Sequence, residues 1–402
     1  MIPFAIFAAT YFVVAIGHFP GLRIDRTGAA IIGASLMIGT GTLTFEEAVQ
    51  AVDYSTLVLL FGMMIVVASL RFSGFFRWVG VLAMRRAHGS LTLLGAVVVL
   101  SGVFSAFFVN DTICLALTPL VLEVTRATGR NPVPYLLAVA MASNAGSVAT
   151  ITGNPQNMMI GSLSRIPYPQ FTAALAPVAA VSLVLTFLVI AVLYRRELLG
   201  AQPVQVQEVR VRLNRALLWK SAAVSVGMIV FFFAGWPVAR VAIVAGALLL
   251  VTRRVKPEKV YHEIDWALLA LFAGLFVVVA GVEKTSLDEN LFRFASRFRL
   301  GNVWVLSGFS ALLSNLVSNV PAVLVFRPLI DHLPYPQQGW LTLAMSSTLA
   351  GNLTILGSVA NLIVVQLARR EAKITFWEYL RAGAPLTLLS LAVGAAWLHW
   401  QR

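Results

Sequence analysis

The sequence predicts an all-α polytopic membrane protein built from two inverted-topology repeats. Hydrophobic residues make up 59% of the 402 residues and charged residues only 12%, whereas a soluble globular protein carries about 25% charged residues. Lipid admits only helices and closed barrels, and a barrel would show short segments of alternating hydrophobicity. The apolar runs here are long and continuous, so we expect helices. Each repeat is predicted to hold five crossings, one of them a broken helix, and one re-entrant hairpin.

Apolar stretches define the crossings in order along the chain. They lie near 2–17, 28–43, 55–70, 134–165 and 172–194 in the first half, and near 217–234, 238–252, 266–282, 339–370 and 383–400 in the second. The first stretch lacks a basic n-region, so it is interpreted as a membrane helix and not as a cleaved signal. The segment 72–88 mixes basic and aromatic residues, which is typical of an amphipathic helix at the membrane interface.

Internal similarity indicates that the two halves arose by duplication. Three blocks recur in the same order, at offsets that fall slightly from one block to the next, as expected when loops change length. The matched pairs are Asp53 and Asp265, Gly62 and Gly274, Asn110 and Asn319, Thr150 and Thr354, Gly153 and Gly357, and Asn157 and Asn361. We therefore predict a first repeat over 1–195, a linker over 196–216 and a second repeat over 217–402.

The basic residues predict how the halves are oriented. If 90–125 and 302–331 are hairpins that enter and leave on one side, 22 of the 30 Lys and Arg residues fall on one side of the membrane. Short loops rich in Lys and Arg stay in the cytoplasm, so the linker is expected there and the N-terminus outside. Five crossings in each half then insert the halves in opposite orientations, as in secondary transporters. The net charge of +13 thus requires no nucleic acid partner.

Polar residues interrupt the apolar pattern at four places at membrane depth. Two are the hairpin tips, and two are breaks inside 134–165 and 339–370. Irregular backbone is tolerated at this depth where it lines a cavity or packs in protein. Asn154-Pro155 is typical of a helix N-cap followed by Pro, and Ser358 is expected to cap the matching helix. Four helix N-termini, each partly positive, would then converge on a small anion.

The candidate solute-binding residues are the amides, hydroxyls and glycines of these breaks. No Lys or Arg lies within them, so we expect an anion to be held without a full counter-charge. The carbonyls that end the preceding helices would suit Na⁺. Hydrogen bonding between helices is the alternative role. The candidates are Asn110, Thr112, Ser143, Asn144, Thr150, Thr152, Gly153, Asn154, Gln156, Asn157, Ser318, Asn319, Thr348, Asn352, Thr354, Gly357, Ser358 and Asn361.

Asp111, at the first hairpin tip, is the one acidic residue expected deep in the membrane. The matching position in the second hairpin holds Val320. An intramembrane acid is costly and by default functional. Asp111, with Asn110 and Asn144, is therefore the candidate site for a coupling H⁺ or Na⁺. The alternative is an aspartate that caps its own helix.

The other reactive side chains favour structural roles. Cys114 is expected to be a small buried residue and not a ligand for a thiophilic solute. Asp53 and Asp265 are expected to cap helices, and Gly62 and Gly274 to permit close helix packing. The five His residues show no ligand spacing, so no metal site or cofactor is predicted. Because no nucleophile–base or H-E-x-x-H motif is present, an enzyme is not expected.

Four stretches resemble a superfamily of ion transporters. "VNDTICLALTPLVL" and "TGNPQN" resemble signatures of arsenite-efflux permeases, NhaD-type sodium/proton antiporters and related anion permeases. "SNVPAVL" and "TILGSVANLIVV" resemble their second-half counterparts. The resemblance covers nearly the whole chain and implies an ArsB/NhaD-like permease with an elevator-type mechanism, often dimeric. The tips depart from the Ser-Asn-Thr motifs of sodium/dicarboxylate carriers, which argues against such a symporter.

The sequence thus predicts a secondary active transporter in the cytoplasmic (inner) membrane. It would move a small inorganic or organic anion or an oxyanion-like solute, arsenite included, coupled to H⁺ or Na⁺. A Na⁺/H⁺ antiporter is the alternative within transport, weakened by the missing acid in the second half. A membrane scaffold or a channel is the alternative of another class. The expected partners are the lipid bilayer, the solute and a second copy of the chain.

Overall fold

The computed structural model describes residues 2–17, 23–87, 89–199, 213–253, 255–284 and 297–401. Most of the predicted linker and two of the five His residues, His18 and His88, lie outside these ranges. The described residues fold into α-helices joined by short connections, which confirms the all-α prediction. Six of these helices are long and apolar enough to cross a membrane. Six shorter helices are also apolar.

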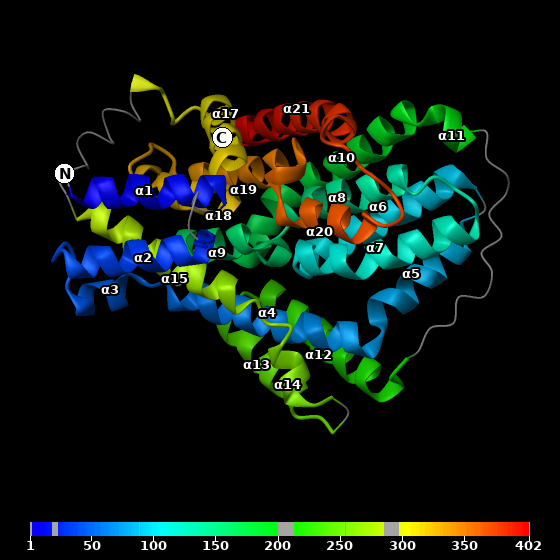
Figure 1. The fold of residues 1–402 in the computed structure, drawn as a ribbon, viewed down its shortest axis with the longest axis horizontal. Helices are drawn as coiled ribbons and strands as arrows, with labels where there is room; N and C mark the ends of the chain where they lie inside the picture. The colour runs from blue at the N-terminus through cyan, green and yellow to red at the C-terminus, as the bar shows by residue number, and fades with distance from the viewer. Residues whose placement is uncertain are drawn as a thin grey trace.

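The first half runs from two short apolar helices to a hairpin, a broken helix and a long helix (Figure 1). Its elements are α1 (Ile2–Ile16), α2 (Arg26–Gly39), α3 (Phe45–Ala51), α4 (Tyr54–Ser73), α5 (Phe75–Arg85), α6 (Ser90–Phe107), α7 (Asn110–Ala127), α8 (Val133–Ser147), the 3₁₀ turn η1 (Ile151–Gly153), α9 (Pro155–Ser164), α10 (Tyr168–Leu193) and α11 (Arg195–Leu199). The hairpin is α6 with α7, and α8 and α9 form the broken helix.

The second half presents the same kinds of element in the same order. Its elements are α12 (Arg215–Phe233), α13 (Val238–Leu250), α14 (Pro257–Tyr261), α15 (Trp266–Glu283), α17 (Val303–Val317), α18 (Asn319–Ile330), α19 (Pro336–Ala350), the 3₁₀ turn η2 (Ile355–Gly357), α20 (Val359–Ala368) and α21 (Phe376–Trp400). The hairpin is α17 with α18, and α19 and α20 form the broken helix.

Three predicted boundaries differ from the structure by four residues or more, and one of them is the start of α10 at Tyr168 and not near 172. The last helix starts at Phe376 and not near 383, because the Thr375 side chain accepts a hydrogen bond from the Glu378 N–H and caps the helix there. The apolar stretch of this helix begins several residues after Phe376, so hydropathy alone placed the start of the helix too late. The second helix ends at Gly39 and not near 43, because Gly41 takes a positive φ of 72°, a conformation that favours glycine and ends helices.

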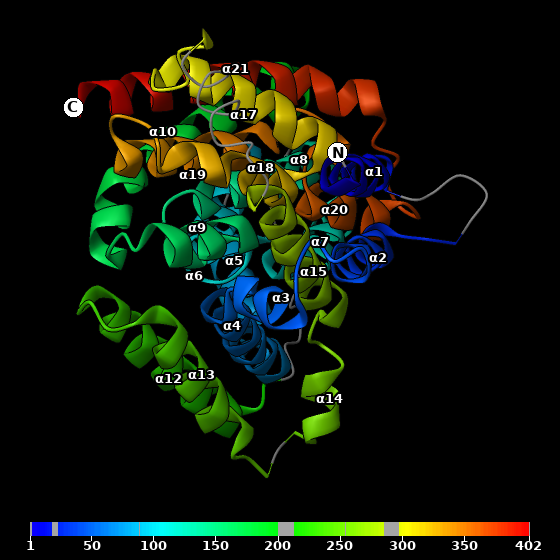
Figure 2. The same cartoon turned by 90° about the vertical axis from the view of Figure 1, so that its left-hand side faces the viewer.

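Two contacts between the halves, called the crossed contacts below, are related by the internal repeat. Helix α4 of the first half packs against α13 of the second, and α2 of the first packs against α15 of the second. In Figures 1 and 2, α4, α12 and α13 lie in the lower part of the view, and α10, α19 and α21 lie in the upper part. The hairpins and broken helices contact one another and these upper helices. The protein therefore contains two helix groups. Helix α15 contacts α4 in one group and the hairpin helix α18 in the other, and α2 packs against α15.

In both crossed contacts, a glycine allows the backbones of the two helices to approach closely. A Cβ added to Gly62 would lie 2.6 Å from the backbone of Ala242, and one added to Gly274 would lie 2.8 Å from the backbone of Ala30. The predicted packing role of the two glycines is confirmed. The two contacts also match residue for residue at an offset of 212, since 62 pairs with 274 and 30 with 242.

Replacing either glycine tests this packing. We expect Gly62→Ala and Gly274→Ala each to lower the stability by about 1–3 kcal/mol, because a backbone cannot move aside cheaply. The measurement is the thermal unfolding midpoint of the purified protein in detergent. The matched control is Gly227→Ala in α12, where a Cβ meets no atom within 4 Å. Equal midpoints for all three variants would show that the glycines do not set the packing.

Candidate functional site

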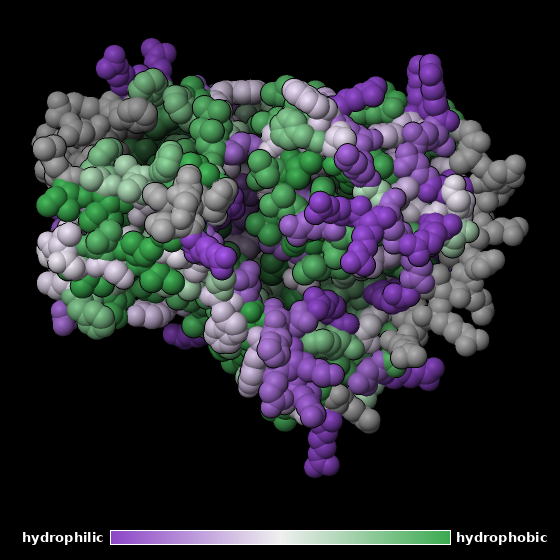
Figure 3. All heavy atoms as spheres, viewed as in Figure 1, coloured by the Kyte–Doolittle hydropathy of each residue, from purple (hydrophilic) through white to green (hydrophobic). Residues whose placement is uncertain are grey.

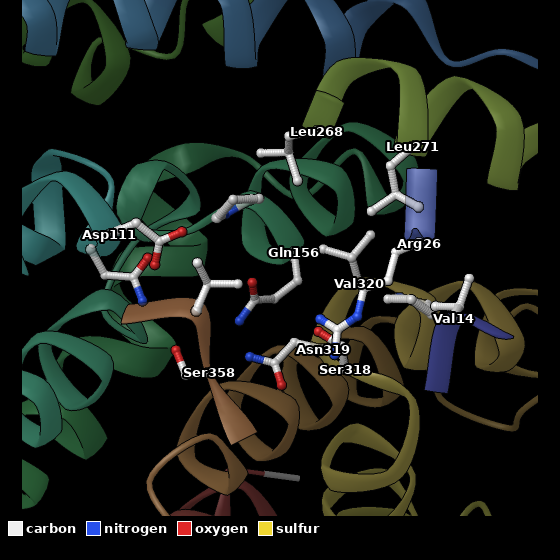
Figure 4. Close-up of a pocket in the computed structure, with 14 residues that line it drawn as sticks. Val14, Arg26, Asp111, Gln156, Leu268, Leu271, Ser318, Asn319, Val320 and Ser358 are labelled. Carbon is white, nitrogen blue, oxygen red and sulfur yellow. The ribbon is translucent and has the colours of Figure 1, made fainter. Parts of the chain in front are cut away.

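One cavity lies where the two hairpin tips and the two broken helices meet. Its volume is about 80 Å³, and one water requires roughly 10–15 Å³ on this measure, so it has room for a small solute. The N-termini of α7, α9, α18 and α20 all reach it (Figure 4). The lining residues are Val14, Arg26, Asn110, Asp111, Pro155, Gln156, Leu268, Leu271, Ser318, Asn319, Val320, Pro321, Ser358 and Val359.

The local sequence explains why helices begin at the cavity. Asn154 caps α9, since its side chain accepts a hydrogen bond of 2.8 Å from the Asn157 N–H, and Pro155 follows at the first helical position, as predicted. Ser318, before α18, takes a positive φ of 77°, which is uncommon for a residue other than glycine. The prediction that Ser358 caps α20 is wrong. Its side chain makes no cap hydrogen bond, and its hydroxyl donates to Asn144 Oδ1 at 3.0 Å instead.

Two asparagine side chains satisfy the backbone of the two broken helices. Carbonyls at an interrupted helix end have no partner within the helix, and in a membrane no water replaces it. In each half one Nδ2 group donates to two such carbonyls, at positions that match by an offset of 204. The bonds are Asn157 to Ser147 O at 3.0 Å and Thr150 O at 3.1 Å, and Asn361 to Gly351 O at 2.7 Å and Thr354 O at 3.0 Å.

These bonds fix the orientation of a chain of amides that ends at the cavity. Because Asn361 Nδ2 faces two carbonyls, its Oδ1 faces Asn144 Nδ2, at 3.0 Å. Asn144 Nδ2 also donates to Asn352 Oδ1 at 3.0 Å. Asn144 Oδ1 accepts from Ser358 and from Asn110 Nδ2, each at 3.0 Å. All four hydrogen-bonding positions of Asn144 are thus filled, and none is left for a solute.

Two oxygens at the cavity are left without a donor. Among the described residues, neither Asn110 Oδ1 nor Asn319 Oδ1 has a hydrogen-bond partner, although the residues are only 4% and 9% exposed. Buried acceptors are nearly always paired in folded proteins, so each exception calls for an explanation. One residue belongs to each hairpin tip, and both line the cavity. They are the two positions that the internal repeat matches at the tips.

The cavity also holds one charge of each sign. The expectation that no cation faces the site is wrong, since Arg26 lines the cavity. Helix α2 has only 14 residues, about 21 Å at 1.5 Å per residue, which is less than a hydrocarbon core of about 30 Å. In Figure 4, Arg26 and Asp111 lie at opposite ends of the cavity, with Gln156 and Asn319 between them.

Asp111 does not cap its own helix. Helix α7 has no side-chain cap, and the Asp111 carboxyl group faces the backbone N–H of Ala360, in the first turn of α20. The acid therefore joins the first hairpin tip to the second broken helix. This contact is the kind of arrangement that changes when the tip or the broken helix moves.

Six predicted site residues line the cavity, and the others lie behind it. The six are Asn110, Asp111, Gln156, Ser318, Asn319 and Ser358. Those behind it are Thr112, Ser143, Asn144, Thr150, Thr152, Gly153, Asn154, Asn157, Thr348, Asn352, Thr354, Gly357 and Asn361. Several of these bond to neighbouring helices, as Thr152 does to the Tyr168 hydroxyl at 3.0 Å and Thr354 to Asn315 Oδ1 at 3.4 Å. Which of these residues a solute contacts stays a prediction.

Cys114, Asp53 and Asp265 lie where their predicted structural roles require. Cys114 is buried, 3.1 Å from the Ser143 hydroxyl. Asp53 and Asp265 each accept a hydrogen bond from the third residue of the helix that follows. The described residues contain no group of three or more His, Cys, Asp or Glu side chains that could hold a metal ion. Arg26 is the residue that the sequence did not indicate, although its place at the start of a helix too short to span a bilayer could have done so.

Comparison with known proteins connects this architecture to membrane transport. The model of the citrate transporter family (CitMHS) matches residues 10–350. The silicon efflux transporter LSI3 of Oryza sativa subsp. japonica is 32% identical over 461 residues, covering 96% of this chain and 95% of that protein. An uncharacterized transporter of Mycobacterium tuberculosis is 30% identical over 424 residues, covering 99% and 98%.

A solved structure has a similar fold. The YdaH transporter of Alcanivorax borkumensis, described as having an unusual topology, superimposes with a TM-score of 0.63 at 15% sequence identity. The match covers 99% of this chain and 96% of that one. At this level of identity the likeness concerns the fold.

Replacing Asn144, whose hydrogen-bonding positions are all filled, and replacing Asn319, whose oxygen has no partner, should change the stability differently. We expect Asn144→Ala to lower the stability by about 2–4 kcal/mol, since hydrogen bonds between membrane helices contribute roughly 0.5–1 kcal/mol each and four are lost. Asn319→Ala removes an oxygen that has no partner and should leave the midpoint unchanged or raise it. Thermal unfolding of the two purified variants beside the native protein measures both effects. A lower midpoint for Asn319→Ala than for Asn144→Ala would contradict the network described above.

Proposed function

The chain belongs to the citrate transporter family, and from that membership we propose that it is a secondary active transporter for a small anion or oxyanion-like solute, coupled to H⁺ or Na⁺. The observation that carries the proposal is the cavity at which four helix N-termini meet. Helix N-termini attract anions, and broken helices that meet within the membrane are typical of secondary transporters. A scaffold protein would not require the unpaired polar groups that line this cavity.

The cavity favours a solute of few heavy atoms. A volume of about 80 Å³ suits an oxyacid such as arsenite better than a tricarboxylate, although the family takes its name from citrate. The rice relative is a silicon efflux transporter, and silicon in solution is likewise a small oxyacid. Arsenite is therefore our first choice of substrate to test.

Asp111 is our proposed coupling residue. It is the one carboxylate among the described residues that line the cavity, so it can exchange H⁺ or Na⁺ beside the solute. A dedicated Na⁺/H⁺ antiporter is a weaker proposal, because Arg26 lies in the same cavity and repels a cation.

The ion pairs support the proposed inverted topology. Five ion pairs between described residues each join two helix ends that the charge distribution assigns to the same side of the membrane. Three belong to the proposed cytoplasmic side: Arg71 with Glu263, Arg77 with Glu123, and Arg126 with Glu371. Two belong to the proposed outer side: Lys284 with Glu47, and Arg327 with Glu283. A wrong orientation of either half would have paired ends from opposite sides.

The surface has a matching asymmetry. Hydrophilic residues gather over the part of the molecule that carries α5, α7 and α11 and around α14, whereas the part that carries α1 and α2 is largely apolar (Figure 3). Exposed basic residues in the hydrophilic part are Arg85, Arg86, Arg126, Arg195, Arg196, Arg369, Arg370 and Lys373. We propose that this part faces the cytoplasm.

The two helix groups support an elevator-type mechanism. Arg26, Leu268 and Leu271 reach the cavity from α2 and α15, whereas the polar residues reach it from the hairpin tips and broken helices. If the hairpins and broken helices move as one body along α2 and α15, the solute moves with them. The cavity is then exposed first to one side of the membrane and then to the other.

Transport in proteoliposomes tests the function. We expect the native protein to move arsenite faster when a pH or Na⁺ gradient is imposed. Asp111→Asn should reduce this flux to its value without a gradient, because the group that exchanges the coupling ion is lost. The matched control is Glu123→Gln, at the other end of α7. A native flux that ignores both gradients would rule out the coupled carrier, and a native response in Asp111→Asn would rule out the role of Asp111.

Cysteine labelling tests the topology. The single native cysteine is buried, so a cysteine placed in a helix end will dominate the signal. With a membrane-impermeant maleimide on intact cells, we expect labelling of Glu46→Cys, in the first turn of α3. Glu258→Cys, in α14, should react only after the membrane is opened. The reverse pattern would invert the proposed orientation, and labelling of both would contradict it.

A further inference from the structure

The groups without partners at the cavity divide into two chemical kinds. Asn110 Oδ1 and Asn319 Oδ1 are buried acceptors that lack a donor. Arg26 is a donor that lacks an acceptor: within the part of the chain that the structure describes, its guanidinium makes no ion pair and no hydrogen bond. A solute that satisfies all three side chains must bring both acceptors and donors.

We propose that the site selects a partly protonated oxyacid anion, and that Arg26 is the residue that sets this specificity. Such a solute carries a negatively charged oxygen for the guanidinium and at least one O–H group for the asparagine oxygens. The inference rests on the proposed function, since it takes this cavity to be the solute site. It goes further because it defines the charge and the protonation of the solute.

Arg26 is placed to bind an oxygen anion. Its planar guanidinium offers five N–H donors that match two oxygens at once. The carboxylate next to it in sequence, Asp25, is already used, because it accepts a hydrogen bond of 2.8 Å from the Gly28 N–H and caps α2. Asp111 lies at the far end of the cavity in Figure 4. The space between the two charges is therefore where a negatively charged oxygen would bind Arg26.

The two asparagine oxygens discriminate among anions. Asn110 cannot turn its amide to offer an N–H group, because its Nδ2 is held by Asn144 Oδ1. A fully deprotonated oxyanion would place a further acceptor beside Asn110 Oδ1 and leave both unpaired, whereas no hydrogen bond between described residues holds the Asn319 amide in place. A site built to hydrogen-bond a hydroxyl group rejects analogues that lack it. An O–H group on the solute removes this penalty.

The charges come from one repeat, although the asparagines come from both. At the offset of 212 set by the crossed contacts, Arg26 corresponds to Val238. At the offset of 209 that pairs Asn110 with Asn319 at the hairpin tips, Asp111 corresponds to Val320. Each hairpin tip thus provides one oxygen, while only the first half provides charge. The site therefore has a symmetric pair of acceptors, Asn110 Oδ1 and Asn319 Oδ1, and one cation, Arg26. Helix packing alone does not require this combination in a duplicated chain.

Three solutes used as probes distinguish the effect of the solute's charge from the effect of its O–H groups. At neutral pH hydrogen selenite carries one negative charge and one O–H group, arsenous acid carries O–H groups and no charge, and sulfate carries charge and no O–H group. We expect hydrogen selenite to raise the thermal midpoint of the full-length native protein at the lowest concentration, since a ligand stabilises the state it binds.

Variants at the two kinds of group complete the test. Arg26→Gln should weaken hydrogen selenite binding roughly tenfold or more, the usual worth of a hydrogen bond to a charged group, and leave arsenous acid binding unchanged. Arg26→Lys should retain part of the affinity, which separates loss of charge from loss of fold. Asn319→Ala should narrow the preference for hydrogen selenite over sulfate. The matched control is Arg23→Gln, which alters an exposed residue of the same connection.

Two results would overturn the inference. One is a native protein that binds sulfate as well as hydrogen selenite, and the other is an Arg26→Gln variant that binds all three probes like the native protein. Either result is compatible with gradient-driven arsenite flux in proteoliposomes, in which case the transporter proposal stands and only the specificity is wrong. Absence of gradient-driven flux in the native protein defeats the proposed function instead.

Discussion

The structure depends on the hydrogen bonds that two asparagine side chains make to interrupted helices within the membrane. A broken helix exposes carbonyls that lipid cannot satisfy, and Asn157 and Asn361 each satisfy two of them. Because side chains take over this task, α9 and α20 can restart with their N-terminal N–H groups directed at a cavity. The same bonds orient Asn361, and through Asn144 they orient Asn110. The chemistry of the cavity is thus set by backbone groups some distance behind it.

Much of the fold follows from local sequence, since hydropathy, the Asn154-Pro155 cap and the tip motifs place the helices and their restarts. The matched glycines Gly62 and Gly274 were also predictable, because the repeat aligned them. Local sequence could not show which amide side chains bond to one another and which line the cavity. Their positions depend on partners some 200 residues away in sequence. The same limit produced the wrong cap at Ser358, whose acceptor belongs to another helix. Arg26 was missed because a charge at a helix start was taken to lie outside the membrane.

The asymmetry between the halves matters more for function than their similarity. The crossed contacts of α2 with α15 and of α4 with α13 repeat almost residue for residue, so they provide a frame. The charges do not repeat, since the second half holds Val238 and Val320 where the first holds Arg26 and Asp111. In the proposed transporter, a symmetric frame presents the site to either side of the membrane, and Arg26 and Asp111 are the groups proposed to select the solute and the coupling ion.

In the proposed cycle, the unpaired groups explain how occupancy and movement are linked. Enclosing a cation without a partner in a region of low dielectric is costly, and so is enclosing acceptors without donors. When the cavity is open, water can satisfy Arg26, Asn110 and Asn319. When it closes without solute, that water is lost and nothing replaces it. A bound oxyacid anion replaces that water at the guanidinium with its charged oxygen, and at an asparagine oxygen with each O–H group that it carries. Movement of the hairpin tips past α2 therefore meets a lower energy barrier when solute is bound than when the cavity is empty. The cost of enclosing unpaired polar groups thus accounts both for the selectivity of the site and for the coupling of movement to solute binding.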